Sequence, residues 1–416
     1  YPLEIDVVNE VETMRQRRAP AATHEPIEDF YKFKNLEGNS EKCKLVDDVT
    51  QQHPLVPVSL LIKTRPSDVS KRNVIRETWG RERIVTIVDK CDDDKNDQRI
   101  IALCSSSPSL LLSIRTIRYF IVGDPNLNAD FRRENEAHGD LIQYNFVDSY
   151  LNNTIKTVLG LRWIATYCPS ARYVLFVDDD YHVNVHNLAR FIASLLLGKP
   201  DALSENDSLQ LDNYNFATNN TDIDNDKFMD NLRLSPAHHN LFPNKASRVQ
   251  LMYGGRRLSS ARPIRTRSSV WYLPINAYPY SSFPPYINAG AYLMSSESVA
   301  RFWLASRWIK RFPFDDVYLG IVAWKLGVKP RCIPGFLYHH SDEPYSRQRF
   351  RSVIAAHGFS NHNRLRQAYI DSEQWEASHD LNDSYSHGGT VRVVFNWRRH
   401  FFQYFKQSQA TCIDGG

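Results

Sequence analysis

The chain has 416 residues, of which 42% are hydrophobic and 24% are charged, so neither a disordered chain nor a membrane bundle is expected. Lys and Arg number 51 against 47 Asp and Glu, which leaves a formal net charge of +4. That excess is too small for a dedicated nucleic-acid-binding protein, so an anionic partner is expected at a local site. At about 150 residues per domain, the length allows two to three domains.

The N-terminal region has no globular pattern. Residues 1–54 are polar with little periodicity, and they predict a weakly ordered stem or linker. No run in the chain approaches the ~18 continuous apolar residues that a membrane helix needs. Because the chain begins at Tyr1 and not at Met, we expect that an N-terminal piece with a signal or anchor is missing.

Cysteines and glycosylation sequons indicate the compartment. Six cysteines permit three disulfides in any of 15 pairings, and Cys91 and Cys104 are placed to close the acidic loop between them. No CxxC spacing occurs, so a structural zinc site is not expected. The N-x-S/T sequons begin at Asn152, Asn206, Asn219 and Asn382. Together these features favour the secretory pathway.

Apolar runs and helical periodicities then alternate along the chain. The expected strands are 57–62, 117–122, 141–146, 173–177 and 289–294, and the expected helices are 71–79, 148–168, 185–197, 296–309 and 317–326. This alternation predicts an α/β domain with a mostly parallel central sheet flanked by helices. It covers residues 55–375, with polar insertions near 84–113 and 199–248 and a C-terminal extension at 376–416.

Three consecutive carboxylates, Asp178, Asp179 and Asp180, follow the most apolar predicted strand. Like charges this close raise one another's pKa unless a cation neutralises them, and ligands of open α/β sheets bind at this edge. Their oxygen atoms suit Mg²⁺ or Mn²⁺, which can bridge a diphosphate. The alternative is a solvated acidic turn, but the preceding buried strand favours the metal site.

A basic segment lies earlier in the chain. Arg72 and Arg76 are four residues apart and share one face of a predicted helix that ends near Trp79. Two guanidinium groups on one face suit a phosphate, and the indole suits stacking on a base. The pattern equally fits a solvated basic face paired with Glu77 and Glu82, and a tryptophan packed in the core.

Two later segments carry further candidates. Residues 314–320 (FDDVYLG) place an acidic pair at a helix start, which is either a cap or the source of a general base for an alcohol nucleophile. Residues 283–292 (FPPYINAGAY) combine prolines with small residues around Gly290. Small residues permit close backbone approach to a ligand, and the alternative is a rigid turn into a strand.

In this order, the segments resemble the β1,3-galactosyltransferase and β1,3-N-acetylglucosaminyltransferase family, glycosyltransferase family 31, and most of all its Brainiac-like branch. The resemblance covers residues 55–375. The matching segments are KRNVIRETWG (71–80), FIVG (120–123), GDLIQYNFVDSYLNNTIKT (139–157), CPSARYVLFVDDD (168–180), FPPYINAGAYLMS (283–295), FDDVYLG (314–320) and SVIAAHGF (352–359).

The resemblance implies a GT-A fold, a UDP-sugar donor, Mn²⁺ and inversion at the anomeric carbon. It also implies a Golgi membrane protein with a lumenal catalytic domain, held by an N-terminal anchor absent from this chain. It makes Asp316 the catalytic base, Asp180 a metal ligand supported by Asp179, and His357 the source of an imidazole ligand. The residues that it implies at the donor are Arg72, Arg76, Trp79, Lys156, Asp178, Asp179 and Gly290.

We therefore expect transfer of galactose or N-acetylglucosamine from UDP-galactose or UDP-N-acetylglucosamine to a hydroxyl of an acceptor glycan, on a glycolipid or glycoprotein, in β1,3 linkage. The Brainiac-like wording leans toward N-acetylglucosamine, with galactose close behind. A catalytically inactive family member that only binds glycan or nucleotide is the main alternative, and the intact motif set argues against it. A metal-dependent phosphoesterase is a third hypothesis, but it gives no role to the segments at 72–79 and 283–286.

Overall fold

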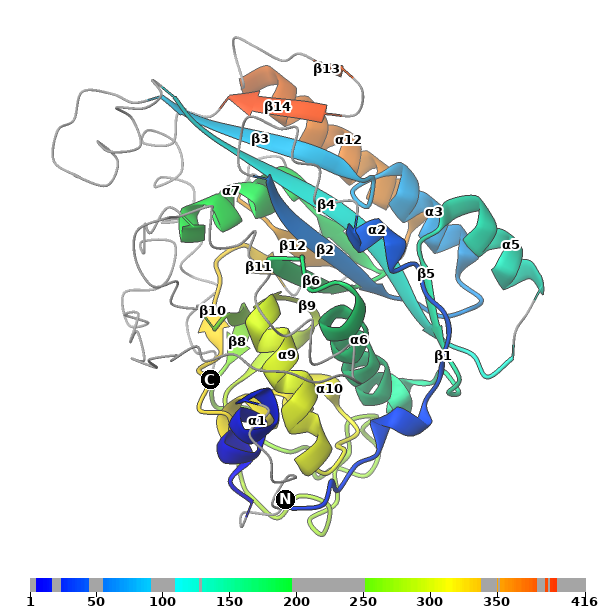
Figure 1. Cartoon of the computed structure of the whole chain (residues 1–416), viewed down its shortest axis with the longest axis vertical. Helices are drawn as coiled ribbons and strands as arrows, with labels where there is room; N and C mark the ends of the chain where they lie inside the picture. Colours follow the sequence, from blue (N-terminus) through cyan, green and yellow to red (C-terminus); the bar gives the residue numbers. More distant parts are fainter. Residues whose placement is uncertain are drawn as a thin grey trace, which may run out of the picture.

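The computed structural model describes residues 5–16, 24–44, 55–90, 109–126, 129–196, 251–337, 350, 352–379, 386–387 and 390–394. These residues form a central sheet with helices on both faces (Figure 1). The helices are α1 (Val7–Gln16), α2 (Glu41–Lys44), α3 (Val69–Glu77), α5 (Ala129–His138), α6 (Asn153–Tyr167), α7 (Val185–Leu196), α9 (Ser296–Ala305), α10 (Asp315–Lys325) and α12 (His362–His379), with 3-10 turns η1 (Phe30–Lys32), η2 (Tyr150–Asn152) and η5 (Ser306–Trp308).

The strands form one large sheet and one small sheet. In the large sheet they are β1 (Asn35–Glu37), β2 (Leu55–Lys63), β3 (Arg83–Lys90), β4 (Ser109–Gly123), β5 (Leu141–Tyr144), β6 (Tyr173–Asp178), β8 (Tyr253–Leu258), β9 (Tyr286–Ser295), β10 (Arg331–Cys332), β13 (Ser386–His387) and β14 (Thr390–Val394). The order is β10-β8-β9-β6-β2-β4-β3-β14-β13, and off this path β5 pairs with β4 and β1 pairs with β5. The small sheet is β11 (Phe336–Leu337), β12 (Ala355–His357) and β7 (Tyr181–Val183).

The predicted α/β class with a mostly parallel core is confirmed. Strands β6, β2, β4 and β5 pair in parallel, as their nearly continuous apolar sequences indicate, whereas β9 and β8 add to β6 as antiparallel neighbours. Strand β8 was not predicted, because its sequence YGGRRL lacks an apolar run. The sequence also predicted only the end of β4, which extends back to Ser109 in a long antiparallel pairing with β3.

Alternate side chains of the buried strands face two hydrophobic cores. In β6, Val174 and Phe176 pack toward α6, α9 and α10, while Leu175 and Val177 pack toward α3, α7 and α12. Both cores consist of residues from the sheet and from the helices that cover it, which makes three layers. This arrangement leaves the carboxyl ends of the parallel strands as one continuous edge.

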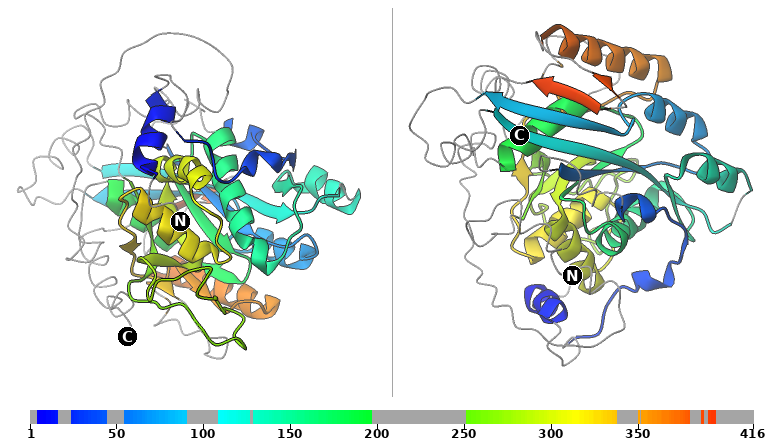
Figure 2. Two further views of the ribbon diagram at one scale, coloured as in Figure 1. Left: turned by 90° about the horizontal axis from the view of Figure 1, so that it is seen from below. Right: turned by 45° about the horizontal axis from the view of Figure 1, so that its top comes forward.

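The N-terminal region differs from the predicted loose stem. Ile5, Val7 and Val11 are buried in the core that includes α6, α9 and α10. Arg15 forms an ion pair with Glu297 of α9. Figure 2 shows α1 lying beside α9. These contacts involve residues far along the chain, so the local sequence carried no sign of them. Residues 5–16 and 24–44 therefore belong to the folded domain.

A disulfide joins this N-terminal region to α6, which covers one face of the sheet. Cys43 is bonded to Cys168, at the end of α6, across a sequence separation of 125 residues. Because closing a loop of this size restricts the unfolded chain, replacing both cysteines by serine is expected to lower the free energy of unfolding by about 2–4 kcal/mol. Urea denaturation of the double variant against the parent measures this, and equal midpoints would contradict it.

The other predicted peripheral regions lie partly outside the described residues. The described part of the C-terminal extension adds β14 in parallel to β3, over Thr390↔Ile84 to Val394↔Val88, so it completes the main sheet. Cys91, Cys104 and the insertion at 199–248 lie outside the described residues. Across the described ranges, the structure contains no helix with the length and apolar character of a membrane span.

Candidate active site

The carboxyl edge of the sheet gathers the acidic residues of the predicted site. Lys63 and Asp178 are register partners at the ends of the parallel strands β2 and β6. Strand β9 enters the sheet at the same edge, with Ala291 opposite Val177. Helix α10 begins there at Asp315, and Ala289 donates its backbone N–H to the Asp316 carboxylate over 3.3 Å. Segments from four parts of the sequence thus meet at one edge.

Each carboxylate of the acidic triplet has its own basic partner. Asp178 lies 3.0 Å from Lys63 Nζ, Asp179 lies 3.0 Å from Lys71 Nζ, and Asp180 lies 3.1 Å from Nε2 of His357. The two lysine cations thus compensate part of the repulsion expected from three adjacent charges.

Burial changes the proton affinity of the three carboxylates unequally. It raises the pKa of Asp178 and of Asp179 above the ordinary value, even though the lysines oppose this. Burial also pushes the pKa of Asp180 upward, but the hydrogen bond and charge of His357 outweigh it and hold that pKa below the ordinary value. Asp180 is therefore the member of the triplet best suited to remain ionised and bind a cation.

The small sheet brings His357 to Asp180. Strand β12 pairs antiparallel with β7, which places His357 opposite Tyr181, directly after the triplet. The backbone N–H of Phe359 donates to the carbonyl oxygen of Asp180 over 2.8 Å, and the Tyr181 and His357 rings lie 5.2 Å apart. The structure thus brings together two residues 177 positions apart that the sequence predicted at one metal.

The acidic pair at the start of α10 divides into two roles. Asp315 is buried and accepts hydrogen bonds from Lys63 Nζ and Thr157 Oγ1, each 2.8 Å long. These partners hold its pKa below the ordinary value despite burial. No residue in the described part of the chain forms an ion pair with Asp316, and burial and the neighbouring Asp315 charge raise its pKa to about 6. A carboxylate with this pKa is ionised at neutral pH and is a stronger base than an exposed aspartate.

Lys63 connects the two acidic groups. Its ammonium group is almost fully buried, 3.0 Å from Asp178 and 2.8 Å from Asp315. These two carboxylates raise the pKa of Lys63 well above its ordinary value, although burial opposes them. Lys63 was not among the predicted site residues, although it directly follows a predicted strand. It could have been identified from the parallel pairing of β2 and β6, because the two strands end at the same edge of the sheet.

Gly290 allows the backbone of β9 to come close to Tyr181. Its φ is +101°, a conformation that favours glycine, and a Cβ at this position would collide with the Tyr181 ring. The Tyr181 hydroxyl donates to the carbonyl oxygen of Ala289 over 3.2 Å. The close approach predicted for Gly290 is therefore made by a side chain of this protein.

The two predicted phosphate-binding arginines already have carboxylate partners. Arg72 is fully buried, pairs with Glu134 over 2.7 Å and donates to the carbonyl oxygen of Arg65 over 2.6 Å. Arg76 binds both oxygens of Asp140, at 2.7 and 2.9 Å. Arg72 therefore joins α3 to α5 and holds the loop after β2, and Arg76 joins α3 to Glu134 of α5 and to Asp140.

Two other predicted donor residues are also enclosed. Trp79 is 1% exposed and packs in the core on the side of α3, α7 and α12. Lys156 pairs with Asp148 over 2.7 Å and donates to the carbonyl oxygen of Thr64 over 2.8 Å. In this structure Lys156 supports the loop at the end of β2.

Asp180 and His357 fit a divalent cation only as part of its ligand set. Among the residues that the structure describes, no group of three or more His, Cys, Asp or Glu side chains is arranged to hold a metal ion. The pair offers one carboxylate oxygen and one imidazole nitrogen, both partly exposed. These donors suit Mn²⁺ if oxygen atoms of a ligand and water complete the coordination.

An α/β sheet with acidic residues at its carboxyl edge, and a basic carboxylate at the start of a neighbouring helix, is the architecture of a GT-A type glycosyltransferase. Residues 70–206 and 209–334 match the galactosyltransferase family. The match covers more than half of the chain, and the chain belongs to this family of transferases.

Several relatives share this match at similar identity. The chain is 28% identical over 308 residues to the β-1,3-galactosyltransferase brn of Drosophila melanogaster, covering 73% of this chain and 70% of that protein. It is 28% identical over 335 residues to β-1,3-galactosyltransferase 2 of Mus musculus, covering 79% of this chain and 60% of that protein. It is also 28% identical over 304 residues to β-1,3-galactosyltransferase 1 of Mus musculus, covering 72% and 69%.

Proposed function

We propose that this chain is an inverting glycosyltransferase that moves galactose from UDP-galactose to a hydroxyl of an acceptor glycan in β1,3 linkage. The observation that carries the proposal is Asp316, a carboxylate with a raised pKa, at the sheet edge that also holds Asp178, Asp179 and Asp180. The names of the relatives favour galactose as the transferred sugar. N-acetylglucosamine is the second candidate, because the sequence resembles enzymes of both kinds.

The chemistry needs one protein base. Asp316 accepts the proton of the acceptor hydroxyl while that oxygen forms a bond to the anomeric carbon of the donor sugar. The bond from this carbon to the UDP oxygen breaks on the opposite face, so the configuration inverts and UDP leaves with the bonding electrons. The backbone N–H of Ala289 donates to the Asp316 carboxylate and keeps it oriented between β9 and α10.

We further propose that Asp180 and His357 hold Mn²⁺ together with the donor diphosphate. When bound, Mn²⁺ supplies positive charge that stabilises the diphosphate as it leaves. Asp179 is adjacent to Asp180 in the chain and forms an ion pair with Lys71. It therefore orients Lys71 and supports the metal site indirectly. Because Arg72 is engaged with Glu134 and with the carbonyl oxygen of Arg65, we assign it to positioning the loop after β2, and we assign Arg76, which pairs with Asp140, to holding α3 in place.

Asp180→Asn is expected to weaken Mn²⁺-dependent UDP binding about 10–100-fold, because it removes a charged oxygen ligand. Titration calorimetry with UDP, in Mn²⁺ and in chelator, measures the effect. Asp130→Asn, at an exposed position on α5, is the matched control. Mn²⁺-dependent binding that stays at the parental level in Asp180→Asn would rule out this ligand.

The pH dependence of transfer follows from the raised pKa of Asp316, which is about 6. The base must be ionised, so kcat/KM is expected to be constant above that pH and to fall about tenfold per unit below it. Rates at saturating Mn²⁺, with UDP binding measured at each pH, separate protonation of Asp316 from loss of the metal. Constant kcat/KM down to about pH 5 would contradict the assignment.

A donor screen tests the reaction itself. The full chain is incubated with Mn²⁺ and either UDP-galactose or UDP-N-acetylglucosamine, and the linkage and anomeric configuration of the product are determined. A β1,3-linked galactoside is the expected product. Binding of both donors without transfer to any acceptor would favour the alternative of an inactive, ligand-binding family member.

We also propose that the protein lies in the Golgi with its catalytic domain in the lumen, where it acts on a glycolipid or a glycoprotein. The Cys43–Cys168 disulfide supports an oxidising compartment. Immunolocalisation of the full-length protein against Golgi markers tests this location.

A further inference from the structure

Two aromatic side chains are joined on the surface. Trp271 donates its indole N–H to the hydroxyl of Tyr150 over 2.8 Å, although the two residues are 121 positions apart. Trp271 is 50% exposed and Tyr150 is 57% exposed. The hydrogen bond fixes the relative orientation of these two exposed rings. We call Trp271 and Tyr150 the aromatic pair.

The loop that carries Trp271 is preorganised. The guanidinium group of Arg265 donates to the carbonyl oxygens of Leu273, Tyr278 and Tyr280 at 2.7, 2.6 and 3.0 Å. One arginine therefore ties both sides of Trp271's loop together. The indole is presented without a large loss of conformational freedom on binding, which favours ligand affinity.

Packed rings connect this loop to the candidate base. The Tyr278 ring lies 5.0 Å from Phe283 and 5.9 Å from Phe312, and Phe312 lies 5.7 Å from Phe314. Phe314 immediately precedes the first turn of α10, which contains Asp316. The loop of Trp271 therefore has a fixed position relative to the start of α10.

Tyr150 is connected to the same helix start through α6. It lies on η2, directly before α6. In α6, Thr154 Oγ1 donates to the carbonyl oxygen of Phe312 over 2.6 Å, and Thr157 Oγ1 donates to Asp315 over 2.8 Å. Both segments that supply the aromatic pair are therefore anchored to the residues that place Asp316.

We propose that the aromatic pair binds the acceptor glycan by stacking a sugar ring one unit away from the ring that carries the attacking hydroxyl. The inference rests on the proposed transfer reaction. Tyr150 precedes Thr157, whose hydroxyl contacts Asp315, by about two helical turns, so a ring on the pair is displaced from the reacting ring. An aromatic face contacts the apolar C–H face of a pyranose, and the Tyr150 hydroxyl, which accepts from Trp271, keeps its own O–H to donate to the edge of the sugar. The pair thereby selects acceptors longer than one sugar.

Trp271→Ala tests this with acceptors of two lengths. We expect the KM for N-acetyllactosamine and lactose to rise roughly tenfold, while the KM for methyl β-galactoside and for the donor changes less than about twofold. Trp271→Phe keeps the stacking face and should retain most of the preference for the disaccharides. Trp324→Ala is the matched control, because Trp324 is 57% exposed on α10.

Three results would overturn the proposal. One is an unchanged disaccharide KM in Trp271→Ala with an active parent, which rejects the aromatic pair and leaves the transferase assignment intact. The second is an effect confined to lipid-linked or protein-linked acceptors, which would assign the pair to a different partner surface. The third is the absence of transfer by the parent with either donor, which would overturn the proposed function and this inference together.

Discussion

Asp316→Asn is expected to reduce the rate of sugar transfer by about 10³-fold, because an amide cannot accept the proton of the acceptor hydroxyl. The substitution preserves shape, but the N–H groups of Ala289 and Val317 bind different carboxylate oxygens, so the single amide oxygen of asparagine keeps only one of them. It also removes a partly buried charge next to Asp315, which offsets part of the cost of the lost hydrogen bond. Transfer kinetics, together with calorimetric UDP binding, measure the two effects separately.

Comparing turnover with UDP binding distinguishes the loss of the catalytic base from damage to the donor site. UDP affinity in the variant should stay within about twofold of the parent, because Asp316 makes no contact with Asp180 or His357 among the hydrogen bonds of the described residues. Asp130→Asn, which changes an exposed carboxylate on α5, should leave both quantities unchanged. Turnover retained in Asp316→Asn would remove this residue from the mechanism.

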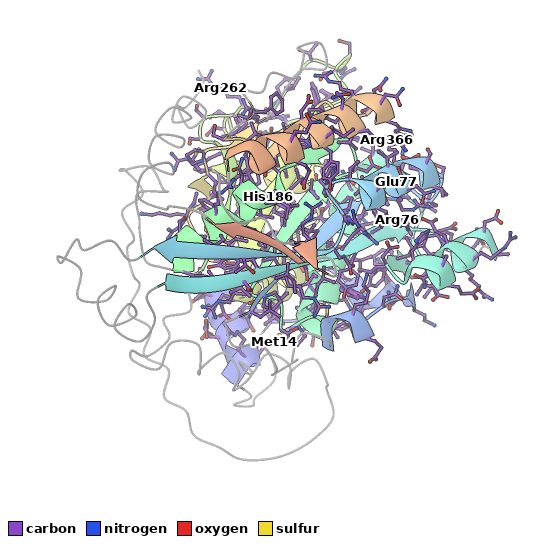
Figure 3. All side chains as sticks on the ribbon, turned by 90° about the horizontal axis from the view of Figure 1, so that it is seen from above. Met14, Arg76, Glu77, His186, Arg262 and Arg366 are labelled. Carbon is purple, nitrogen blue, oxygen red and sulfur yellow. A yellow bond between two sulfur atoms is a disulfide. The ribbon has the colours of Figure 1, made fainter. Side chains whose placement is uncertain are left out.

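Lys63→Met is expected to lower the free energy of unfolding at pH 7 by about 3–5 kcal/mol, because it leaves Asp178 and Asp315 facing each other without their shared cation. Urea denaturation measures the loss. Arg366→Met is the control, since Figure 3 shows Arg366 of α12 beside Glu77 of α3 on the surface, where the pair has a distance of 2.8 Å. An exposed pair of this kind should change stability by about 1 kcal/mol or less.

The pH dependence of the Lys63 effect has a definite sign. Lys63 lowers the pKa of Asp315 in the folded state, so their interaction stabilises the fold above the ordinary carboxyl pKa and is lost as the pH falls below it. The pKa of Lys63 is itself raised, so the stabilisation is complete below the ordinary lysine pKa. The difference between Lys63→Met and the parent should therefore shrink from neutral pH toward acid. A small loss of stability in Lys63→Met at pH 7 would contradict the pairing. An equal loss when Lys63→Met is made in a chain that already carries Asp315→Asn would also contradict it.

Much of the fold was accessible from sequence because local patterns carried it. The apolar run before Asp178 indicated a buried strand, and its end indicated the ligand-binding edge of an α/β sheet. The helix that starts at Asp315 and the strand around Gly290 were likewise visible as periodicity. By contrast, β8, the early part of β4 and the packing of α1 depend on partners far away in the chain, which no local pattern reports.

The sequence by itself determined which carboxylates end a strand and which open a helix, because both properties depend on neighbouring residues. Only the tertiary structure decided their partners. In the folded chain, Arg72 forms an ion pair with Glu134 and Arg76 with Asp140, and Lys63 lies between two acidic segments. The physical reason is that an ion pair depends on distance in space and on burial, and both arise only when the sheet edge, α6 and α10 pack together.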